Sequence, residues 1–576
     1  MISVREAARI IRAGGVVAYP TETAYGLGAD ALNREAVKKV YRIKGRPRRK
    51  KMPVIVSSVK ELEGHAFLNE LGHHLSRHLH PGPLNIVVNS DLPWFGAFRI
   101  SSSPVASRLA KLAGPITATS ANISGKKPAF NPEELEKLGV PVVGGEKLRE
   151  GPVSTVYDPF TMTVIREGAI PEVKIKRYVV AFNVLKRVKP PEAESRKILK
   201  LGKEVLELVK KHHRKTVLGG SIAKGTFTRN VRDIDLFLLF PKGEKLEGKL
   251  ELLKGIAASF SKQVETSYAQ HPYVKARFRG ITVELVPAYD TKPPEVLSAA
   301  DRSRWHVKFV RSLPDWLRDE ILMFKQFCDG IGVYGAESRV EGLSSYAMEV
   351  LVAKNRGFVK ALEKLSRTGW PLRVKDPVDK KRNVTASISE ESFALLKEAA
   401  KEYLKNPGER FFFPQKPPLL KKLHGLRNKA LVVLKKPDLP EDAAWGNAKR
   451  RARKLARNAR LEGYLVKRWS VLVGKRVLAL FEFFPGEKKL IVKGPPVTKK
   501  EHARRFKEAH PHWFEENGRL YAEEKRRFES FSELVRHFEN AEVLEGDRIE
   551  GEYKKMGTEE KLWVSEFLIN RKPWEY

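Results

Sequence analysis

The sequence predicts a multidomain α+β protein, and three observations support this fold class. The chain has 576 residues, far more than one hydrophobic core usually organises, so three to five domains are expected. Strand-like alternation over 233–240 and 280–289 precedes a mostly helical region that begins at Asp315. Beyond residue 418 strand and helix patterns alternate again, which indicates at least one further α+β domain.

The composition excludes several classes of protein. Lys and Arg number 108 against 69 Asp and Glu, and this net charge of +39 predicts a polyanionic partner such as a nucleic acid. Cys328 is the only cysteine, which excludes a disulfide framework and a cysteine-based zinc site. We expect a soluble, cytoplasmic protein without a membrane partner, because no signal-peptide pattern and no apolar run of membrane length is visible.

The first 173 residues carry small, hydroxyl and glycine residues at the ends of predicted strands. An apolar opening over 7–11 leads through Gly14 and Gly15 into a strand over 16–19. The segments that follow are Pro20-Thr-Glu-Thr-Ala-Tyr-Gly-Leu-Gly28, Lys44-Gly-Arg-Pro47, Pro81-Gly-Pro-Leu84, Thr119-Ser-Ala-Asn-Ile-Ser-Gly125 and Ser154-Thr-Val-Tyr-Asp158. They suit a pocket for phosphate and a small zwitterion, in which Lys44 and Arg46 supply positive charge.

Prolines mark the end of this first domain. Pro171, Pro190 and Pro191 stand among many charged residues, which is typical of an exposed joint. The boundaries that follow are 1–173 for the first domain, 174–181 for a linker and 182–314 for the next domain.

Four histidines, His73, His74, His78 and His80, cluster in the first domain. They have only Glu70 in reach and no cysteine nearby. We therefore expect a solvated helix and turn rather than a metal site.

Two carboxylates follow a glycine-serine turn in the second domain. Side chains two residues apart on a strand point the same way, so Asp233 and Asp235 face one space. The turn at Gly220-Ser221 offers backbone N–H groups to phosphate oxygens. Glu284, the only acid in the strand-like segment 280–289, supplies a third carboxylate. Such a set would hold Mg²⁺ against a triphosphate, although the acids could also lie on the exposed faces of ordinary strands.

The remainder divides into a helical neck over 315–409 and a body and tail over 410–576, separated by the proline-rich stretch 410–418. A hairpin is predicted from 477–484 and 488–492 with its turn at Pro485-Gly486. The most basic helix candidate spans 447–460, and its apolar stripe is Ala448, Ala452, Leu455 and Ala459. Its Lys and Arg residues suit RNA phosphates, and a solvated charged face is the alternative.

The segments of 1–173, in their order and spacing, resemble the YrdC-type threonylcarbamoyl-AMP synthase family, which implies an α/β domain. That family makes threonylcarbamoyl-adenylate from L-threonine, bicarbonate and ATP, and the KEOPS machinery transfers the group to tRNA. The resemblance implies ATP- and threonine-binding roles for Thr23, Lys44, Arg46, Arg99, Ser120, Asn122, Ser154 and Arg166. After Arg99 the family tends to have proline, whereas this chain has Ser101-Ser102-Ser103.

Residues 182–576 resemble the archaeal class I CCA-adding enzymes, which add C, C and A to tRNA 3′ ends from CTP and ATP without a template. Supporting motifs are Ala300-Asp-Arg-Ser-Arg-Trp-His-Val307, Gly332-Val-Tyr-Gly-Ala-Glu337, Asp376-Pro-Val-Asp379 and Gly494-Pro-Pro-Val497. The resemblance implies catalytic and metal-binding roles for Asp233, Asp235 and Glu284. It implies nucleotide-binding roles for Gly220, Ser221, Lys224, His306, Lys325, Tyr334 and Arg382. Arg382 resembles the arginine that reads the incoming base, and Glu284 stands where many relatives have aspartate.

Together the two resemblances imply a bifunctional, Mg²⁺-dependent tRNA-maturation enzyme with a catalytic head, a helical neck and an RNA-binding body and tail. Its partners would be tRNA, CTP, ATP, L-threonine and bicarbonate, with the KEOPS machinery and a second copy of the chain as further candidates. Three alternatives stay open. They are a CCA-adding enzyme with a silent YrdC-like RNA-binding module, a poly(A)-polymerase-like terminal transferase, and a tRNA-binding chaperone with both sites silent.

Overall fold

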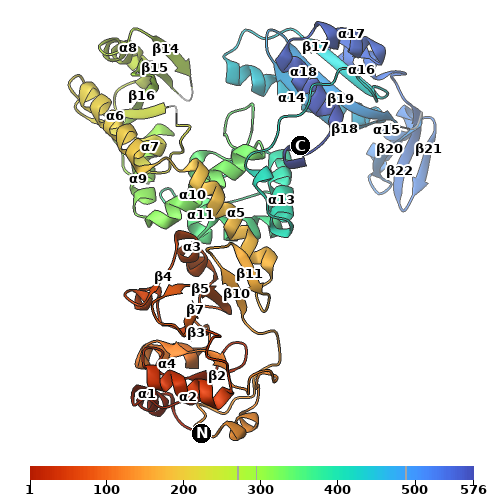
Figure 1. The fold of residues 1–576 in the computed structure, drawn as a ribbon. Helices are drawn as coiled ribbons and strands as arrows, with labels where there is room; N and C mark the ends of the chain where they lie inside the picture. The colour runs from red at the N-terminus through yellow and green to blue at the C-terminus, as the bar shows by residue number, and fades with distance from the viewer. Residues whose placement is uncertain (232, 269–270, 294, 487–488, 576) are drawn as a thin grey trace. The chain divides into compact units, whose positions relative to one another are not determined.

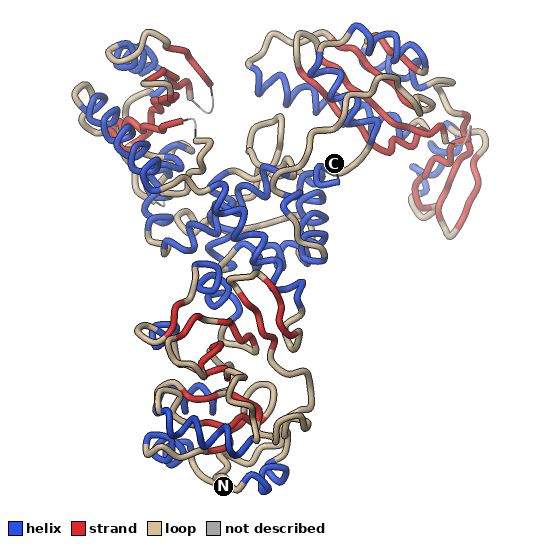
Figure 2. The backbone as a smooth tube through the Cα atoms, viewed as in Figure 1, coloured by secondary structure: helices blue, strands red, loops and turns tan. Residues whose placement is uncertain are grey.

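A computed structural model describes residues 1–231, 233–268, 271–293, 295–486 and 489–575. The chain forms two compact units (Figures 1 and 2). The first unit comprises Met1–Pro190, Gly357–Arg367 and Glu398–Glu409, and the second comprises Pro191–Arg356, Thr368–Lys397 and Arg410–Tyr576. The mixture of helices with several separate sheets confirms the predicted α+β multidomain class. In the described part of the chain, no helix is both long and apolar enough to cross a lipid bilayer.

The first unit contains a six-stranded sheet and a three-stranded sheet. The six strands, in spatial order, are β11 (Thr163–Arg166), β10 (Thr155–Asp158), β5 (Leu84–Val87), β7 (Phe95–Arg99), β3 (Met52–Ile55) and β8 (Ile116–Thr117). The other three are β1 (Val17–Pro20), β2 (Tyr25–Gly28) and β9 (Thr119–Ser120). The helices beside them are α1 (Val4–Arg12), α2 (Arg34–Lys44), α3 (Glu70–Leu79), α4 (Pro104–Ala113) and α5 (Glu172–Val188). Apolar faces of α1, α2 and α4 are buried against β1, β2 and β3.

The linker predicted at 174–181 is wrong, because these residues lie inside α5. Pro171 is the N-cap of α5, and Pro191 is the N-cap of α6 (Glu192–Lys210). Proline is well tolerated where a helix starts, since the N–H it lacks would have no intrahelical acceptor there. Pro171 and Pro191 therefore mark two helix starts, and the boundary between the two compact units falls between Pro190 and Pro191.

Helix α5 joins the first domain to part of the neck within the first unit. Arg177 donates through Nε to the carbonyl oxygen of Leu404 at 2.7 Å, and its own carbonyl oxygen accepts from the Tyr403 hydroxyl at 2.6 Å. Arg187 pairs with Glu409. The neck helices concerned are α12 (Phe358–Arg367) and the second half of α13 (Glu390–Lys405). The boundary drawn at residue 173 thus falls within a packed structure.

The head of the second unit is built on one five-stranded sheet. Its strands, in spatial order, are β12 (Thr216–Leu218), β13 (Asp233–Phe240), β16 (Ile281–Tyr289), β15 (Pro272–Phe278) and β14 (Val264–Tyr268). Its helices are α6, α7 (Gly220–Lys224), α8 (Leu250–Ala258) and α9 (Ser303–Arg311). One face of β13 and the apolar sides of α6 and α8 form a shared core. The neck adds α10 (Asp315–Gly330) and α11 (Ser345–Asn355).

The body and tail have one sheet each. The body strands are β18 (Tyr464–Val473), β19 (Val477–Pro485), β17 (Lys429–Leu434) and β23 (Glu542–Glu545), and its helices are α14 (Glu441–Leu461), α16 (Phe531–Glu539), α17 (Asp547–Lys555) and α18 (Thr558–Ile569). The tail strands are β20 (Lys489–Pro496), β22 (Arg519–Lys525) and β21 (Trp513–Glu516), with α15 (Lys500–Ala509) beside them.

The hairpin predicted around Pro485-Gly486 is wrong. Strand β19 pairs with β18 and β17, whereas β20 pairs with β22 in the tail. Lys488 of the predicted second strand lies outside the described residues. The proline-glycine pair therefore separates two sheets instead of turning one strand onto the next.

Candidate active sites

Three carboxylates meet on one face of the head sheet. Strands β13 and β16 run parallel, with Asp235 directly beside Glu284 and Asp233 beside Thr282. Ile234 is fully buried on the opposite face, as strand alternation requires. The structure thus brings together the three acids that the sequence assigns to a metal site.

The pKa values of Asp235 and Glu284 reflect the neighbouring acids. Burial, followed by the charges of Asp233 and Glu284, raises the pKa of Asp235 to about 7. Burial also raises the pKa of Glu284, although Lys275 opposes this with its Nζ 3.2 Å from Oε1 of Glu284. A buried carboxylate whose ionisation is opposed by two neighbouring acids suits a divalent cation, because the charge of the cation offsets the repulsion. Their oxygens are also the ligands that Mg²⁺ prefers.

Close packing around the backbone requires glycine at positions 219 and 220. Gly220 has φ of +61°, and a Cβ atom on it would lie 1.6 Å from Oδ2 of Asp235. A Cβ atom on Gly219 would lie 2.2 Å from the Phe237 ring. Helix α7 begins at this point, so the Gly-Ser turn lies against the carboxylate face, as a phosphate-binding turn should.

The two lysines predicted to bind nucleotide both pair with one buried carboxylate. Lys224 Nζ lies 2.8 Å from Oε2 of Glu349, and Lys325 Nζ lies 3.0 Å from Oε1 of the same carboxylate. Thr226 also donates to Glu349, at 2.8 Å. The sequence analysis missed Glu349. The pattern that could have identified it is an acidic residue within the otherwise apolar run 346–352.

A second cluster surrounds Asp376. The His306 ring stacks on Tyr346 at 3.5 Å between centroids, and its Nε2 lies 3.5 Å from Oδ2 of Asp376. Asp376 also accepts from the Tyr346 hydroxyl at 2.9 Å and from Arg382 Nη1 at 3.1 Å. Burial by itself raises the pKa of Asp376, but the neighbouring His306 ring and hydrogen bonds from the Val378 amide and the Tyr346 hydroxyl hold it well below its usual range. Asp376 therefore fixes Arg382 beside His306.

Tyr334 is the most accessible of the predicted nucleotide-binding side chains in the neck, with 37% of its surface exposed. It lies in a loop whose ends are joined by the Gly335 amide, which donates to the Leu343 carbonyl oxygen at 3.0 Å. Burial of the hydroxyl, together with the charges of Glu349 and Asp233, raises its pKa to about 12 despite a hydrogen bond with Ser345. The phenol thus stays protonated near neutral pH and can donate to an anion.

The first domain contains a polar pocket between its six-stranded and three-stranded sheets. Six of the eight residues predicted for it line the pocket, namely Thr23, Arg46, Arg99, Ser120, Ser154 and Arg166. Arg99 Nη1 donates to Ser154 Oγ at 2.6 Å, and Arg166 Nη2 donates to the Ser154 carbonyl oxygen at 2.7 Å. Burial, with the charges of Arg99 and Arg46, lowers the pKa of Arg166. Three guanidinium groups in one pocket favour an anionic ligand.

Lys44 and Asn122, the other two predicted residues, do not line this pocket. The Lys44 ammonium is buried and donates to the carbonyl oxygen of Asn122 at 2.7 Å and to its Oδ1 at 2.8 Å. Burial, followed by the charge of Arg46, lowers the pKa of Lys44 to about 8. Lys44 therefore lies behind the turn at Ser120, to which it also donates.

Ser101, which stands where the resembled family tends to have proline, supports the pocket through Glu22. Its hydroxyl donates to the Glu22 carboxylate, which also accepts from Arg99 Nη1 at 3.2 Å. Glu22 was missed in the sequence, although it lies in the segment Pro20–Gly28 next to Thr23. The serine thus adds a hydrogen-bond donor beside Arg99.

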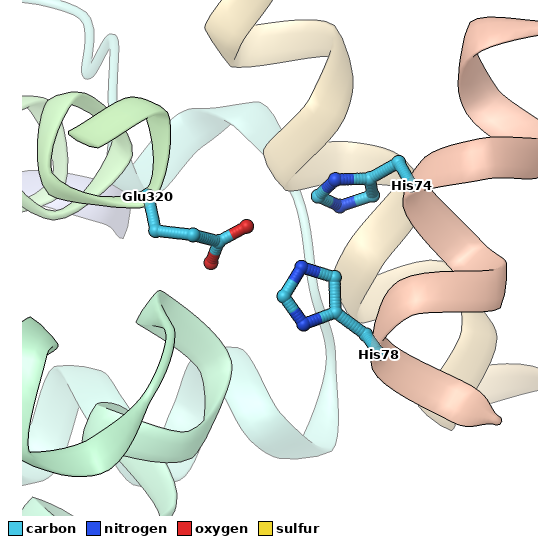
Figure 3. A group of neighbouring side chains, drawn as sticks. All are labelled: His74, His78 and Glu320. Atoms are coloured by element: carbon cyan, nitrogen blue, oxygen red, sulfur yellow. The ribbon is translucent and has the colours of Figure 1, made fainter. Parts of the chain in front are cut away.

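The expectation of a solvated histidine cluster is wrong for His74, which is buried. The His74 and His78 rings project from one side of α3 (Figure 3), with centroids 4.7 Å apart. His74 contacts the Phe182 ring at 5.4 Å, and His78 stacks on Tyr178 at 5.0 Å. Both aromatic partners belong to α5, so these histidines form part of the α3–α5 packing. Glu320, the third side chain in Figure 3, belongs to α10 in the second unit.

The basic helix expected at 447–460 lies within α14, and its apolar stripe is buried as predicted. Several of its cations are used inside the protein, because Lys449 and Arg453 pair with Glu341, and Arg451 pairs with Glu539. The solvent-facing row consists of Arg450, Lys454, Arg457 and Arg460. Their spacing of three and four residues places them on one face of the helix.

Family models match the chain in four regions. Residues 9–168 match the Sua5/YciO/YrdC family, described as telomere recombination. Residues 198–306 match the nucleotidyltransferase domain, and 319–370 with 365–413 match the second domain of tRNA nucleotidyltransferase. Residues 428–555 match the C-terminal domain of the CCA-adding enzyme.

Curated relatives decide the family. The CCA-adding enzyme of Thermococcus gammatolerans is 32% identical over 415 residues, which cover 64% of this chain and 91% of that protein. The chain belongs to the CCA-adding enzymes. The CCA-adding enzyme of Saccharolobus islandicus strain M.14.25 is 34% identical over 314 residues, covering 50% of this chain and 74% of the relative.

This CCA-adding enzyme carries a Sua5/YciO/YrdC domain ahead of its nucleotidyltransferase head. Among solved structures, Sua5 of P. abyssi complexed with L-threonine is 34% identical. The match covers 31% of this chain and 57% of that one, with a TM-score of 0.29. The predicted fusion of the two families is confirmed at the level of the family models.

Proposed function

We propose that the chain adds CCA to tRNA 3′ ends from CTP and ATP and also makes threonylcarbamoyl-AMP from L-threonine, bicarbonate and ATP. The observation that carries the first activity is the carboxylate face of β13 and β16 against the Gly220 turn. The family of the chain supports the same reaction.

In nucleotide addition, Asp233, Asp235 and Glu284 would hold Mg²⁺. When bound, Mg²⁺ lowers the pKa of an attacking hydroxyl and offsets the charge that develops on the phosphates. The turn at Gly220-Ser221 would receive phosphate oxygens on its backbone N–H groups. Tyr334 would donate a hydrogen bond to the nucleotide from its protonated phenol.

Arg382 would select the incoming base. Its guanidinium presents fixed donors, and Asp376 holds one of its nitrogens at 3.1 Å. A fork that cannot rotate freely distinguishes the acceptor edges of C and A from those of U and G. His306, stacked on Tyr346 beside the same carboxylate, would complete the nucleotide site.

For the second activity, the pocket of the first domain supplies the supporting chemistry. Arg46, Arg99 and Arg166 line it together with Thr23 and Ser154. The guanidinium groups suit the phosphates of ATP and the carboxylate of threonine, while hydroxyl groups suit the polar remainder of the amino acid. Ser120 lines the same pocket. Lys44, which donates hydrogen bonds to Ser120 and Asn122, would stabilise the turn that carries both residues.

The tail and the solvent-facing cations of α14, which are Arg450, Lys454, Arg457 and Arg460, would bind tRNA. The KEOPS machinery and a second copy of the chain are further proposed partners. A silent first domain is disfavoured, because three arginines line its pocket and Lys44 supports the adjoining turn at Ser120. A poly(A)-polymerase-like reaction is disfavoured by the match of 428–555 to the CCA-specific C-terminal domain.

The decisive experiment supplies the protein with a tRNA that ends at the discriminator base. CTP, ATP, UTP and GTP are offered singly and in pairs, and products are resolved at single-nucleotide length. Two C additions followed by one A are expected. Long A tails on an oligonucleotide that is not tRNA would favour the poly(A) alternative instead.

A further inference from the structure

Glu349 is a fully buried carboxylate that holds two cations at once. It lies on α11 at 0% exposure, and both of its oxygens accept charged hydrogen bonds. Oε2 accepts from Lys224 at 2.8 Å, whereas Oε1 accepts from Lys325 at 3.0 Å and from Thr226 at 2.8 Å. The Ser345 hydroxyl lies 3.5 Å from Oε1.

These donors come from separate parts of the second unit. Lys224 is the last residue of α7, the short helix that begins at Gly220 against Asp235. Lys325 lies on α10 of the neck and also donates to the Thr226 carbonyl oxygen at 3.0 Å. One carboxylate on α11 therefore ties the turn beside the metal-binding face to the neck.

The charges of this cluster do not cancel. Two ammonium groups share one carboxylate, so these three groups together carry one net positive charge. The side chains of Lys224 and Lys325 are only 9% and 3% exposed, and charges so deeply buried are screened little by salt. Helix α7, only five residues long, joins Lys224 to the turn at Gly220-Ser221, so this weakly screened charge belongs to the same short segment as the turn.

We propose that Glu349 is a positioning residue for the triphosphate of the incoming nucleotide. It fixes the ammonium groups of Lys224 and Lys325 beneath the turn at Gly220-Ser221, where their charge attracts the phosphates. This inference rests on the proposed nucleotide addition and assigns a role to a residue outside the predicted site.

The need for such a residue follows from lysine chemistry. An ammonium group on a flexible four-carbon stem adopts many positions unless a partner holds it. Without the carboxylate, Lys224 and Lys325 would face each other as buried like charges, and one of them would turn outward or lose its proton. Either response removes a fixed positive charge from beneath the phosphate-binding turn.

The test compares full-length Glu349→Gln with the unchanged protein and with Glu482→Gln. Glu482 is a matched control, because it is also a buried glutamate among cations, with Arg468 Nε at 2.5 Å, but it lies in the body. Inorganic tripolyphosphate is the probe for triphosphate binding by calorimetry, and KM is measured for CTP and for tRNA. Thermal unfolding reports stability.

Glu349→Gln should weaken tripolyphosphate binding and raise the KM for CTP about tenfold, since two charge-assisted contacts are lost. The KM for tRNA should stay within about twofold, because most tRNA affinity comes from phosphate contacts elsewhere. Glu482→Gln should leave tripolyphosphate binding unchanged. A lower melting temperature in Glu349→Gln with unaltered tripolyphosphate binding would reduce Glu349 to a structural ion pair and overturn the proposal.

If Glu349→Gln does not fold, the double variant Lys224→Met/Lys325→Met and the triple variant that adds Glu349→Gln supply the answer, because the triple variant removes the carboxylate together with both lysines it pairs with. A positioning role predicts that the triple variant binds tripolyphosphate no more weakly than the double variant, since no lysine is left to position. Markedly weaker binding by the triple variant would mean that Glu349 acts independently of the two lysines and would contradict the proposal. Tripolyphosphate binding without CMP addition to tRNA would instead show that the proposed function itself has failed.

Discussion

Gly220 and Asp235 are so close that a side chain on the glycine would occupy the position of the aspartate oxygen. The distance from an ideal Cβ atom on Gly220 to Oδ2 of Asp235 is 1.6 Å. Gly220 also has φ of +61°, a conformation that residues with side chains rarely adopt. Backbone and carboxylate therefore share a space that only glycine allows.

Gly220→Ala should abolish nucleotide addition, because the methyl group would displace Asp235 and strain the turn. The measurement is the rate of CMP incorporation into tRNA that lacks its 3′ end. Gly255→Ala is the matched control, since a Cβ atom at this α8 position meets nothing within 4 Å. It should keep full activity. Normal incorporation by Gly220→Ala would contradict the assigned phosphate-binding turn.

Replacing both Asp233 and Asp235 with Ala should abolish nucleotide addition while tRNA binding persists. The acids would hold Mg²⁺, whereas tRNA affinity should come from cations that contact phosphates. Filter binding at several salt concentrations, beside the incorporation assay, separates the two effects. A double variant that adds nucleotides at a near-normal rate would show that the metal site lies elsewhere.

Metal affinity in the head should rise with pH up to about 7. Burial and the charges of Asp233 and Glu284 raise the pKa of Asp235 to about 7, so below that pH a cation must displace a proton. Calorimetry with Mn²⁺ in buffers of different ionisation enthalpy should reveal proton release at pH 6 and little at pH 8. Asp235→Asn should lose this pH dependence, and equal proton release at both pH values would exclude Asp235 as its source.

In the full-length protein, pyrophosphate release that requires both threonine and bicarbonate should be lost in Lys44→Ala and kept in Asp233→Ala. Lys44 holds Ser120 and Asn122 at the first-domain pocket, whereas Asp233 belongs to the head. Release is measured without tRNA. A fragment that ends at residue 173 is a poor substitute, because it lacks α5 and the ring contacts of His74 and His78. No threonine-dependent release from the folded protein would leave the first domain as a binding module.

Arg457→Gln should weaken tRNA binding and reduce the slope of log affinity against log salt by about one phosphate contact. Arg457 lies in the exposed row of α14. Arg451→Gln serves as the comparison, because Arg451 pairs with Glu539 at 2.7 Å. It should affect stability more than the salt slope. Equal slopes in Arg457→Gln and the unchanged protein would remove this helix face from the tRNA-binding surface.

Local patterns in the sequence predicted much of the candidate sites. Strand alternation placed Asp233 and Asp235 on one face, and the three- and four-residue spacing of apolar residues identified the buried side of α14. Both inferences depend on backbone geometry that neighbouring residues share. The six predicted residues that line the first-domain pocket were found through motif resemblance rather than through such a pattern.

Tertiary structure decided what residues distant in the sequence do to one another. Lys224 and Lys325 were expected at the nucleotide, but Glu349 on another helix holds both of them. His74 was expected in solvent, but α5 covers it. The sequence determined which residues are charged, which are apolar, and which, like Gly220, can adopt a positive φ. Their partners depend on how helices and strands pack, because a buried charge or ring takes whatever group the fold brings within a few ångströms.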